Sequence, residues 1–208
     1  CFLSTPLLSQ IITIDSHIDI PFDYMENPQH DPGKITDMQV DLAKMKKGGL
    51  DSGFFVVYVP QGPLDKAGFK KAKLLAEKKF LAISKMTKTY PNQIGLALVP
   101  EDIIQLKKNN LLSAAIGIEN GYVIGEDLSL LDHYYSLGAR YMTLTHIGHN
   151  QIADSSMPSK RLNDKEELHG GISAFGKKAI KRMNKLGMMI DISHISDKAS
   201  LEAIKLSS

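Results

Sequence analysis

Apolar and polar positions along this chain predict strands and helices in regular succession. Short apolar runs typical of strands buried on both faces occur at 53–59, 113–118, 141–144 and 188–192, with a further short strand at 94–98. Apolar residues at helical spacing predict helices near 37–47, 66–89, 100–108, 128–137, 176–186 and 197–206, after an irregular segment at 1–10. This alternation predicts an α/β fold with a parallel sheet.

The first strand, expected at about 11–18, carries polar side chains on one face. Successive strand residues point to opposite faces, so Asp15, His17 and Asp19 share a face, while the isoleucines of 14–20 take the other. Imidazole and carboxylate groups are ligands for Zn²⁺ or a similar ion. A solvated strand face is the alternative, and these three residues alone do not decide between the two.

Other strands are also followed by residues that bind metals. Glu119 follows the run 113–118, His146 follows 141–144, and His194 follows 188–192. A β/α barrel assembles its active site from several strand ends, whereas a doubly wound sheet uses one switch point. No glycine-rich phosphate-binding fingerprint follows the first strand. The pattern therefore favours a (β/α)8 TIM-like barrel with the site at its mouth.

Glu119 is the natural candidate for a residue shared by two metal ions. A pair of ions about 3.5–4 Å apart needs a bridging carboxylate. Gly117 and Gly121 flank Glu119 and allow the backbone to approach closely. The alternative is a solvated loop glutamate, which the wholly apolar preceding strand argues against.

Several segments together resemble the membrane dipeptidase (renal dipeptidase) family of zinc peptidases, within the amidohydrolase superfamily. The segments that carry the resemblance are 14–19 (IDSHID), 41–49 (DLAKMKKGG), 54–60 (FFVVYVP), 117–121 (GIENG), 144–146 (LTH) and 186–196 (LGMMIDISHIS). They occur in order over nearly the whole chain. Jointly they are highly specific, although no single one is.

The resemblance implies a binuclear zinc dipeptidase and a role for each matching residue. His17 and Asp19 would bind one zinc, Glu119 would bridge both, and His194 would bind the other. His146 would contact the substrate and help to polarise the scissile carbonyl. The nucleophile would be a metal-bridging hydroxide, formed because two zinc ions acidify a shared water. Family members cleave dipeptides, accept a D-residue at the C-terminal position, and tend to dimerise, so a homodimer is also an expectation.

The remaining candidate residues have weaker assignments. Asp15 either orients a metal ligand without binding the metal itself or has a structural role, and the sequence leaves both possibilities open. Surface or loop positions without a metal are expected for His30, His133, His149 and His169.

The chain also departs from the family pattern. The family's histidine for the second zinc on the sixth strand, a following arginine and an aspartate near the eighth strand have no counterpart here. A complete barrel usually needs about 250 residues. Residues 1–208 are therefore expected to form a partial metallo-dependent hydrolase barrel domain with about five barrel strands, 94–98 being an accessory strand, and to be inactive alone.

Composition limits the classes of partner and the location. The net charge is +2, lysines are spread over helical stretches, and no apolar run reaches the roughly 18 residues of a membrane span. We therefore expect no nucleic-acid partner and no membrane span. The single cysteine, Cys1, excludes an internal disulfide. It is either a processing boundary, which we favour, or the lipid-bearing residue of a bacterial lipoprotein, which would place the protein in the cell envelope. A cytoplasmic location stays open.

Two other functions compete with the dipeptidase. One is another amidohydrolase acting on a cyclic amide, lactone or phosphotriester. Those relatives usually begin with His-x-His and often carry a bridging lysine, whereas this chain has His17-Ile18-Asp19 and Glu119. The other is a metal-free binding protein on the same scaffold, which metal analysis would distinguish.

Overall fold

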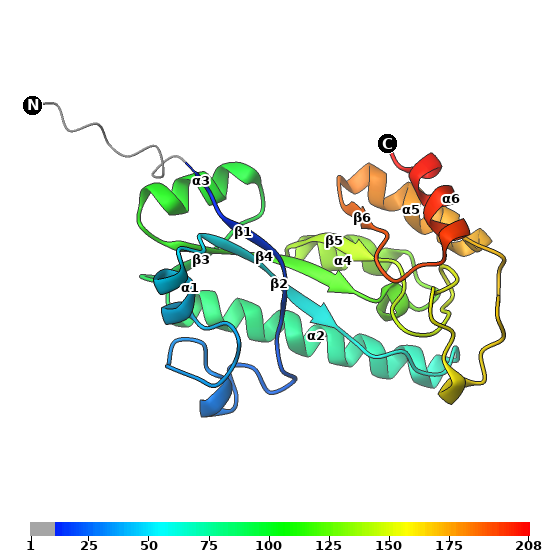
Figure 1. Cartoon of the computed structure of the whole chain (residues 1–208), viewed down its shortest axis with the longest axis horizontal. Helices are drawn as coiled ribbons and strands as arrows, with labels where there is room; N and C mark the ends of the chain where they lie inside the picture. The colour runs from blue at the N-terminus through cyan, green and yellow to red at the C-terminus, as the bar shows by residue number, and fades with distance from the viewer. Residues whose placement is uncertain (1–10) are drawn as a thin grey trace, which may run out of the picture. The chain divides into compact units, whose positions relative to one another are not determined.

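The computed structural model describes residues 11–208, and in these residues strands and helices alternate (Figure 1). The elements are β1 (Ile14–Asp19), α1 (Leu42–Gly48), β2 (Ser52–Tyr58), α2 (Lys66–Thr89), β3 (Ile94–Leu96), α3 (Pro100–Lys108), β4 (Leu112–Glu119), α4 (Ser129–Ser136), β5 (Ala139–Thr143), α5 (Ala174–Leu186), β6 (Met189–Asp191) and α6 (Asp197–Leu206). Three 3-10 helices found among residues 11–208, at Pro28–His30, Gly121–Ile124 and Lys160–Leu162, were not predicted. Every predicted strand and helix is present. The expectations for residues 1–10, including Cys1, lie outside the described residues.

The strands form one sheet of an α/β fold. Hydrogen-bonded neighbours follow the order β1-β2-β4-β5-β6, and β3 pairs with β4 off this path. The pairs β3–β4, β4–β5 and β5–β6 are parallel. The accessory position expected for residues 94–98 is confirmed, and the predicted parallel α/β class is correct.

The chain divides into two compact units. Unit 1 holds the described residues up to Phe55 together with Ala82–Ala115, and unit 2 holds Val56–Leu81 and Ile116–Ser208. Strands β2 and β4 and helix α2 therefore contribute residues to both units.

In unit 1, side-chain hydrogen bonds hold the long loop that follows β1. The Tyr90 hydroxyl donates to the Asp31 carboxylate at 2.6 Å. Helix α1 begins at Leu42 rather than near residue 37, because the Asp41 carboxylate accepts hydrogen bonds from the backbone of Lys44 and Thr36. Burial opposes ionisation of Asp41, yet these hydrogen bonds hold its pKa below the usual value.

In unit 2, helices pack beside the parallel strands. The part of β4 that lies in this unit, Ile116–Glu119, is wholly buried, as expected for a strand covered on both faces. Helix α5 contacts α4, β6 and α6, and the last of these runs beside it (Figure 1). Phe80 of α2 stacks on Tyr134 of α4 with ring centroids 5.2 Å apart. The Ser173 hydroxyl caps α5 by accepting a hydrogen bond from the Gly176 N–H.

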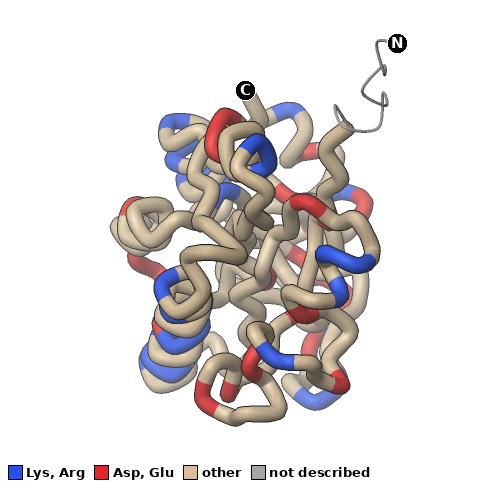
Figure 2. The backbone as a smooth tube through the Cα atoms, turned by 90° about the vertical axis from the view of Figure 1, so that its left-hand side faces the viewer, with Lys and Arg blue, Asp and Glu red and all other residues tan. Residues whose placement is uncertain are grey.

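Charged residues of both signs are interspersed along the chain (Figure 2). Among residues 11–208, no helix is both long enough and apolar enough to cross a membrane.

Candidate metal centre

Three of the predicted site residues meet at one edge of the sheet in unit 2. Strands β4, β5 and β6 are parallel, so their carboxyl ends lie at the same edge. Glu119 ends β4, while His146 and His194 each come three residues after β5 and β6. The Glu119 Oε1 atom lies 3.2 Å from His194 Nε2 and 3.6 Å from His146 Nε2. The three ligand atoms lie within 4.8 Å of one another, close enough to hold one ion.

The trio (Glu119, His146 and His194) suits a divalent metal in its chemistry and burial. The Glu119 side chain is only 8% exposed, whereas that of His194 is 36% exposed. A buried carboxylate facing two imidazoles is not a solvated loop glutamate, so that alternative is wrong. One carboxylate oxygen and two imidazole nitrogens form a donor set that Zn²⁺ prefers. The residues present therefore fit the metal that the sequence predicts.

The glycines beside Glu119 allow close packing, as the sequence predicts. A Cβ atom on Gly117 would lie 2.0 Å from the Tyr141 ring, and one on Gly121 would lie 2.9 Å from the Leu144 carbonyl oxygen. A side chain at Gly117 would therefore require the Tyr141 ring to move, and one at Gly121 would require the Leu144 carbonyl group to move. The two glycines thus allow close packing on either side of Glu119.

His194 has a constrained backbone. Its φ of 67° lies in the left-handed region, which is uncommon for residues other than glycine. Its carbonyl oxygen accepts a hydrogen bond from the Ser156 N–H at 2.8 Å and faces the hydroxyls of Thr145 and Ser155, each at 3.2 Å. The loop after β5 thereby fixes the loop after β6, which orients the His194 imidazole.

His146 is held by its neighbours on both sides. The Ser155 hydroxyl donates to the His146 carbonyl oxygen at 2.5 Å. The Tyr58 ring lies 4.8 Å from the His146 ring, and the His194 ring lies 4.5 Å away. Buried Lys79 places its ammonium 5.7 Å from the Tyr58 ring centroid. The His146 imidazole is therefore packed between an aromatic ring and the other histidine.

His149 lies in a loop, as expected, but it is not a surface residue. Its side chain is buried, with Nδ1 accepting from the Ser155 N–H at 3.0 Å and Nε2 2.9 Å from the Lys165 carbonyl oxygen. His149 is a structural residue of the loop after β5, because a polar loop in sequence folds inward here. His133 and His169 are exposed, as expected, and His30 lies half-buried in the loop after β1.

The other predicted ligands lie in unit 1, at the end of β1. His17 Nε2 lies 3.9 Å from Asp19 Oδ1, and the Asp19 side chain is 69% exposed. The Asp15 carboxylate accepts a hydrogen bond from the backbone N–H of His17 at 2.9 Å. Asp15 therefore contacts the backbone of a predicted ligand. The exposed pair (His17 and Asp19) keeps its assignment as a prediction.

Sequence reasoning missed the buried polar residues that surround the trio. Asn120, Asn150, Asp154 and Ser155 are buried, and all make hydrogen bonds between or within the strand-end loops. Their residue types are those of ordinary solvated loops. One feature of the sequence could have indicated such a residue: Asn120 directly follows the candidate bridging glutamate and is itself followed by a glycine.

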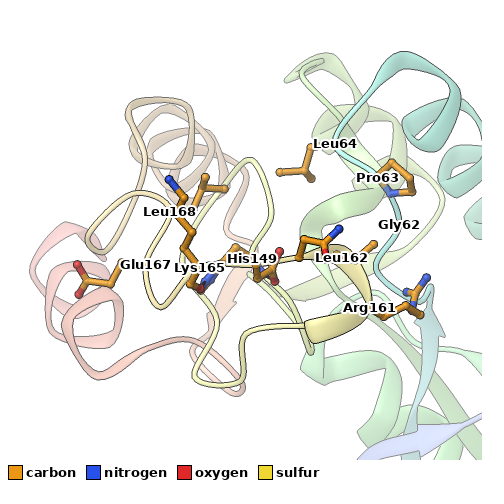
Figure 3. Close-up of a pocket in the computed structure, with 11 residues that line it drawn as sticks. Gly62, Pro63, Leu64, His149, Arg161, Leu162, Lys165, Glu167 and Leu168 are labelled. Atoms are coloured by element: carbon orange, nitrogen blue, oxygen red, sulfur yellow. Dashed lines mark hydrogen bonds between the residues drawn. The ribbon is translucent and has the colours of Figure 1, made fainter.

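Unit 2 also contains an open cavity beside these loops. It has a volume of about 650 Å³ and is lined by residues of 62–64 and 161–168, with His149 (Figure 3). Arg161 lies at one side of it and donates to the Gln61 carbonyl oxygen at 2.6 Å. Its lining does not include the trio, so the cavity is separate from the candidate metal ligands.

Comparison with known proteins finds dipeptidases similar to this chain. The chain is 28% identical over 206 residues to Dipeptidase 3 of Mus musculus, covering 97% of this chain and 40% of that protein. It is 27% identical to Dipeptidase verJ of Clonostachys rogersoniana, covering 91% of this chain and 50% of that protein. The chain thus spans half or less of the length of these relatives.

Solved structures extend the comparison to the fold. The probable dipeptidase PvdM from Pseudomonas aeruginosa matches with a TM-score of 0.90 and 31% identity, covering 96% of this chain and 51% of that one. A metallopeptidase from Rhodobacter sphaeroides, with a TM-score of 0.78 and 19% identity, shares the fold. The family model described as membrane dipeptidase (peptidase family M19) matches residues 4–208. The chain therefore belongs to the membrane dipeptidase family, peptidase family M19.

Proposed function

We propose that the protein to which this chain belongs hydrolyses the peptide bond of dipeptides with two zinc ions. The observation that carries the proposal is the meeting of Glu119, His146 and His194 at the ends of parallel strands, in a chain of the M19 family. Loop residues with solvated side chains are not expected to converge on one buried carboxylate.

The proposed ligand set combines the two groups of predicted residues. His17 and Asp19 would hold one zinc ion, Glu119 would be shared by both ions, and His194 would hold the other. His146 faces the same carboxylate and contacts the substrate carbonyl instead of binding metal. Support for the roles of the exposed pair comes from the sequence resemblance, and support for the trio comes from its distances.

The chain's own residues would bind and orient the substrate. Bound zinc supplies a Lewis acid for the scissile carbonyl and lowers the pKa of water toward neutrality. Glu119 contributes negative charge in a buried position, where charges interact strongly. His146, packed against Tyr58, presents its imidazole at a fixed orientation and can donate a hydrogen bond to the carbonyl oxygen as negative charge develops there.

Metal analysis and a dipeptide assay test this function. The relative from Rhodobacter sphaeroides was solved with a phosphinate mimic of L-Ala-D-Ala, so L-Ala-D-Ala is a suitable first substrate. We expect the full-length protein to bind about two zinc ions, to hydrolyse this dipeptide, to lose activity with a chelator, and to regain it with zinc. An assay of residues 1–208 alone tests the expectation that they are inactive.

Two variants separate the proposed roles of the histidines. His194→Ala should lose zinc and activity together, whereas His146→Ala should keep its zinc and lose activity. Full-length protein that binds no zinc would instead support a metal-free binding protein. Hydrolysis of a cyclic amide or lactone, but of no dipeptide, would place the protein among the other amidohydrolases. A homodimer, also proposed from the resemblance, is checked by light scattering.

A further inference from the structure

We infer that Asn120 and Asn150 form a buried amide pair that positions Glu119 relative to His146. Both asparagines belong to unit 2 and are fully buried. Asn120 directly follows Glu119, and Asn150 lies four residues after His146. The inference rests on the proposed function, in which Glu119 is the shared metal ligand.

Asn120 adopts a backbone conformation that requires support. Its φ of 80° lies in the left-handed region, where asparagine is tolerated better than most residues other than glycine. This turn redirects the chain immediately after the Glu119 carboxylate and begins the 3-10 helix Gly121–Ile124. A change in the Asn120 backbone would therefore rotate the end of β4 and move Glu119.

The Asn120 side chain joins three strand-end segments. Its Nδ2 donates to the Val59 carbonyl oxygen at 3.1 Å and to Gln61 Oε1 at 3.3 Å, after β2. Its Oδ1 accepts from the Tyr122 N–H at 3.1 Å and from Asn150 Nδ2 at 3.0 Å. Both donors and both acceptor sites of the amide are used, so no water is needed to satisfy this buried group.

Asn150 continues the connection to the segment that carries His146. Its Nδ2 also donates to the Leu144 carbonyl oxygen at 2.8 Å, two residues before His146. Its Oδ1 accepts from the N–H groups of Ile152 at 2.8 Å and Ala153 at 3.2 Å. Because backbone donors face Oδ1 and a backbone acceptor faces Nδ2, the amide orientation is unambiguous. The pair thus forms a direct link between the ends of β4 and β5.

The functional consequence is a fixed position of the Glu119 carboxylate, the proposed shared zinc ligand, relative to the segment that carries His146. Residues that orient metal ligands from behind typically change metal affinity or activity about 10–100-fold when replaced. A purely structural amide pair would change the melting temperature and leave the metal affinity of the folded protein unaltered. Zinc affinity therefore separates positioning from general stability.

The test compares Asn120→Gly with Asn110→Gly in the full-length protein. Asn110 is exposed and has a φ of 59°, so both substitutions place glycine at a left-handed position. The readout is the zinc dissociation constant by chelator competition, measured beside the melting temperature of the metal-free protein. We expect the constant to rise about 10–100-fold in Asn120→Gly and to change less than about twofold in Asn110→Gly. An unchanged constant in folded Asn120→Gly overturns the inference.

A double-variant cycle keeps the inference testable if Asn120→Gly folds poorly. Asn120→Asp retains the acceptors for Tyr122 and Asn150 but loses the donors to Val59 and Gln61, and it is combined with Asn150→Ala. Coupled losses of zinc affinity, smaller in the double variant than the product of the single losses, support the pair. Independent losses contradict it. Wild-type protein that binds no zinc would refute the proposed function itself, which is a separate outcome.

Discussion

The exposed pair and the trio around buried Glu119 are two parts of one predicted site, yet they are built differently. In unit 1, Asp19 is 69% exposed and its contact with His17 is 3.9 Å. In unit 2, the Glu119 side chain is 8% exposed and lies 3.2 Å from His194. The pair comes from one strand, whereas the trio comes from the ends of three strands and their loops.

This difference shows how each group obtains its geometry. Strand alternation alone brings His17 and Asp19 to one face, because side chains two residues apart point the same way. The trio depends on contacts between residues far apart in sequence, such as the hydrogen bonds from Ser155 and Ser156 to His194. We therefore expect substitutions around the trio to alter both folding and metal binding, and substitutions in the pair to alter metal binding alone.

The largest expected effect is that of Glu119→Gln on hydrolysis. The substitution keeps the shape of the side chain but removes the buried negative charge and one ligand oxygen. Loss of an outer partner alone costs about 10–100-fold, so loss of the shared ligand should reduce kcat/KM for L-Ala-D-Ala more than about 100-fold. Steady-state kinetics measures it, with exposed Glu126→Gln as the matched control. Near-normal activity of Glu119→Gln would remove Glu119 from the site.

The comparison between pair and trio is sharpened by His17→Ala and His194→Ala. Each variant should reduce bound zinc from about two ions to about one per chain. Because His17 is exposed, His17→Ala should change the free energy of unfolding of the metal-free protein by less than about 0.5 kcal/mol. Elemental analysis and chemical denaturation measure the two quantities. Retention of both zinc ions by His17→Ala would show that the pair does not bind metal.

A third prediction concerns Asp154, which supports the loop after β5. Its carboxylate accepts hydrogen bonds from the N–H groups of Leu168, His169 and Gly171. Asp154→Asn should lower the free energy of unfolding by about 2–4 kcal/mol, because an amide nitrogen would replace a buried acceptor. Denaturant unfolding at neutral pH measures this loss, with exposed Asp37→Asn as the charge-matched control.

Asp154 also predicts a dependence on pH. Burial acts to raise its pKa, but the backbone hydrogen bonds and His149 together lower it below the usual 3.8. A carboxyl group whose pKa is lowered in the folded state stabilises the fold at pH values above its unfolded-state pKa. This stabilisation is lost as the pH falls through the folded-state pKa. The stability difference between wild type and Asp154→Asn should therefore narrow below about pH 4. A constant difference down to pH 2 would contradict this account.

The smallest expected effect is local to helix α5. The Ser173 hydroxyl accepts from the Gly176 N–H at 2.8 Å and lies 2.6 Å from the Gln151 carbonyl oxygen. Ser173→Ala should lower the free energy of unfolding by about 1 kcal/mol, with zinc content unchanged. The control is Ser207→Ala, at an exposed position. A loss of zinc in Ser173→Ala would mean that helix capping and metal binding are coupled.

The sequence determined the elements and the type of site. Strand β4 was predictable because burial on both faces leaves a continuous apolar run in the sequence. Helix α2 was predictable because burial on one face leaves apolar residues at helical spacing. The glutamate and histidines after the strands were recognisable because parallel strands end at one edge. The distances within the trio, the burial of His149 and the Asn120–Asn150 pair were decided only by the tertiary structure. Hydrogen bonds such as that between Asn120 and Asn150 join residues far apart in the chain. The sequence does not show whether the hydrogen-bonding groups of a polar residue bind water or another loop of the protein.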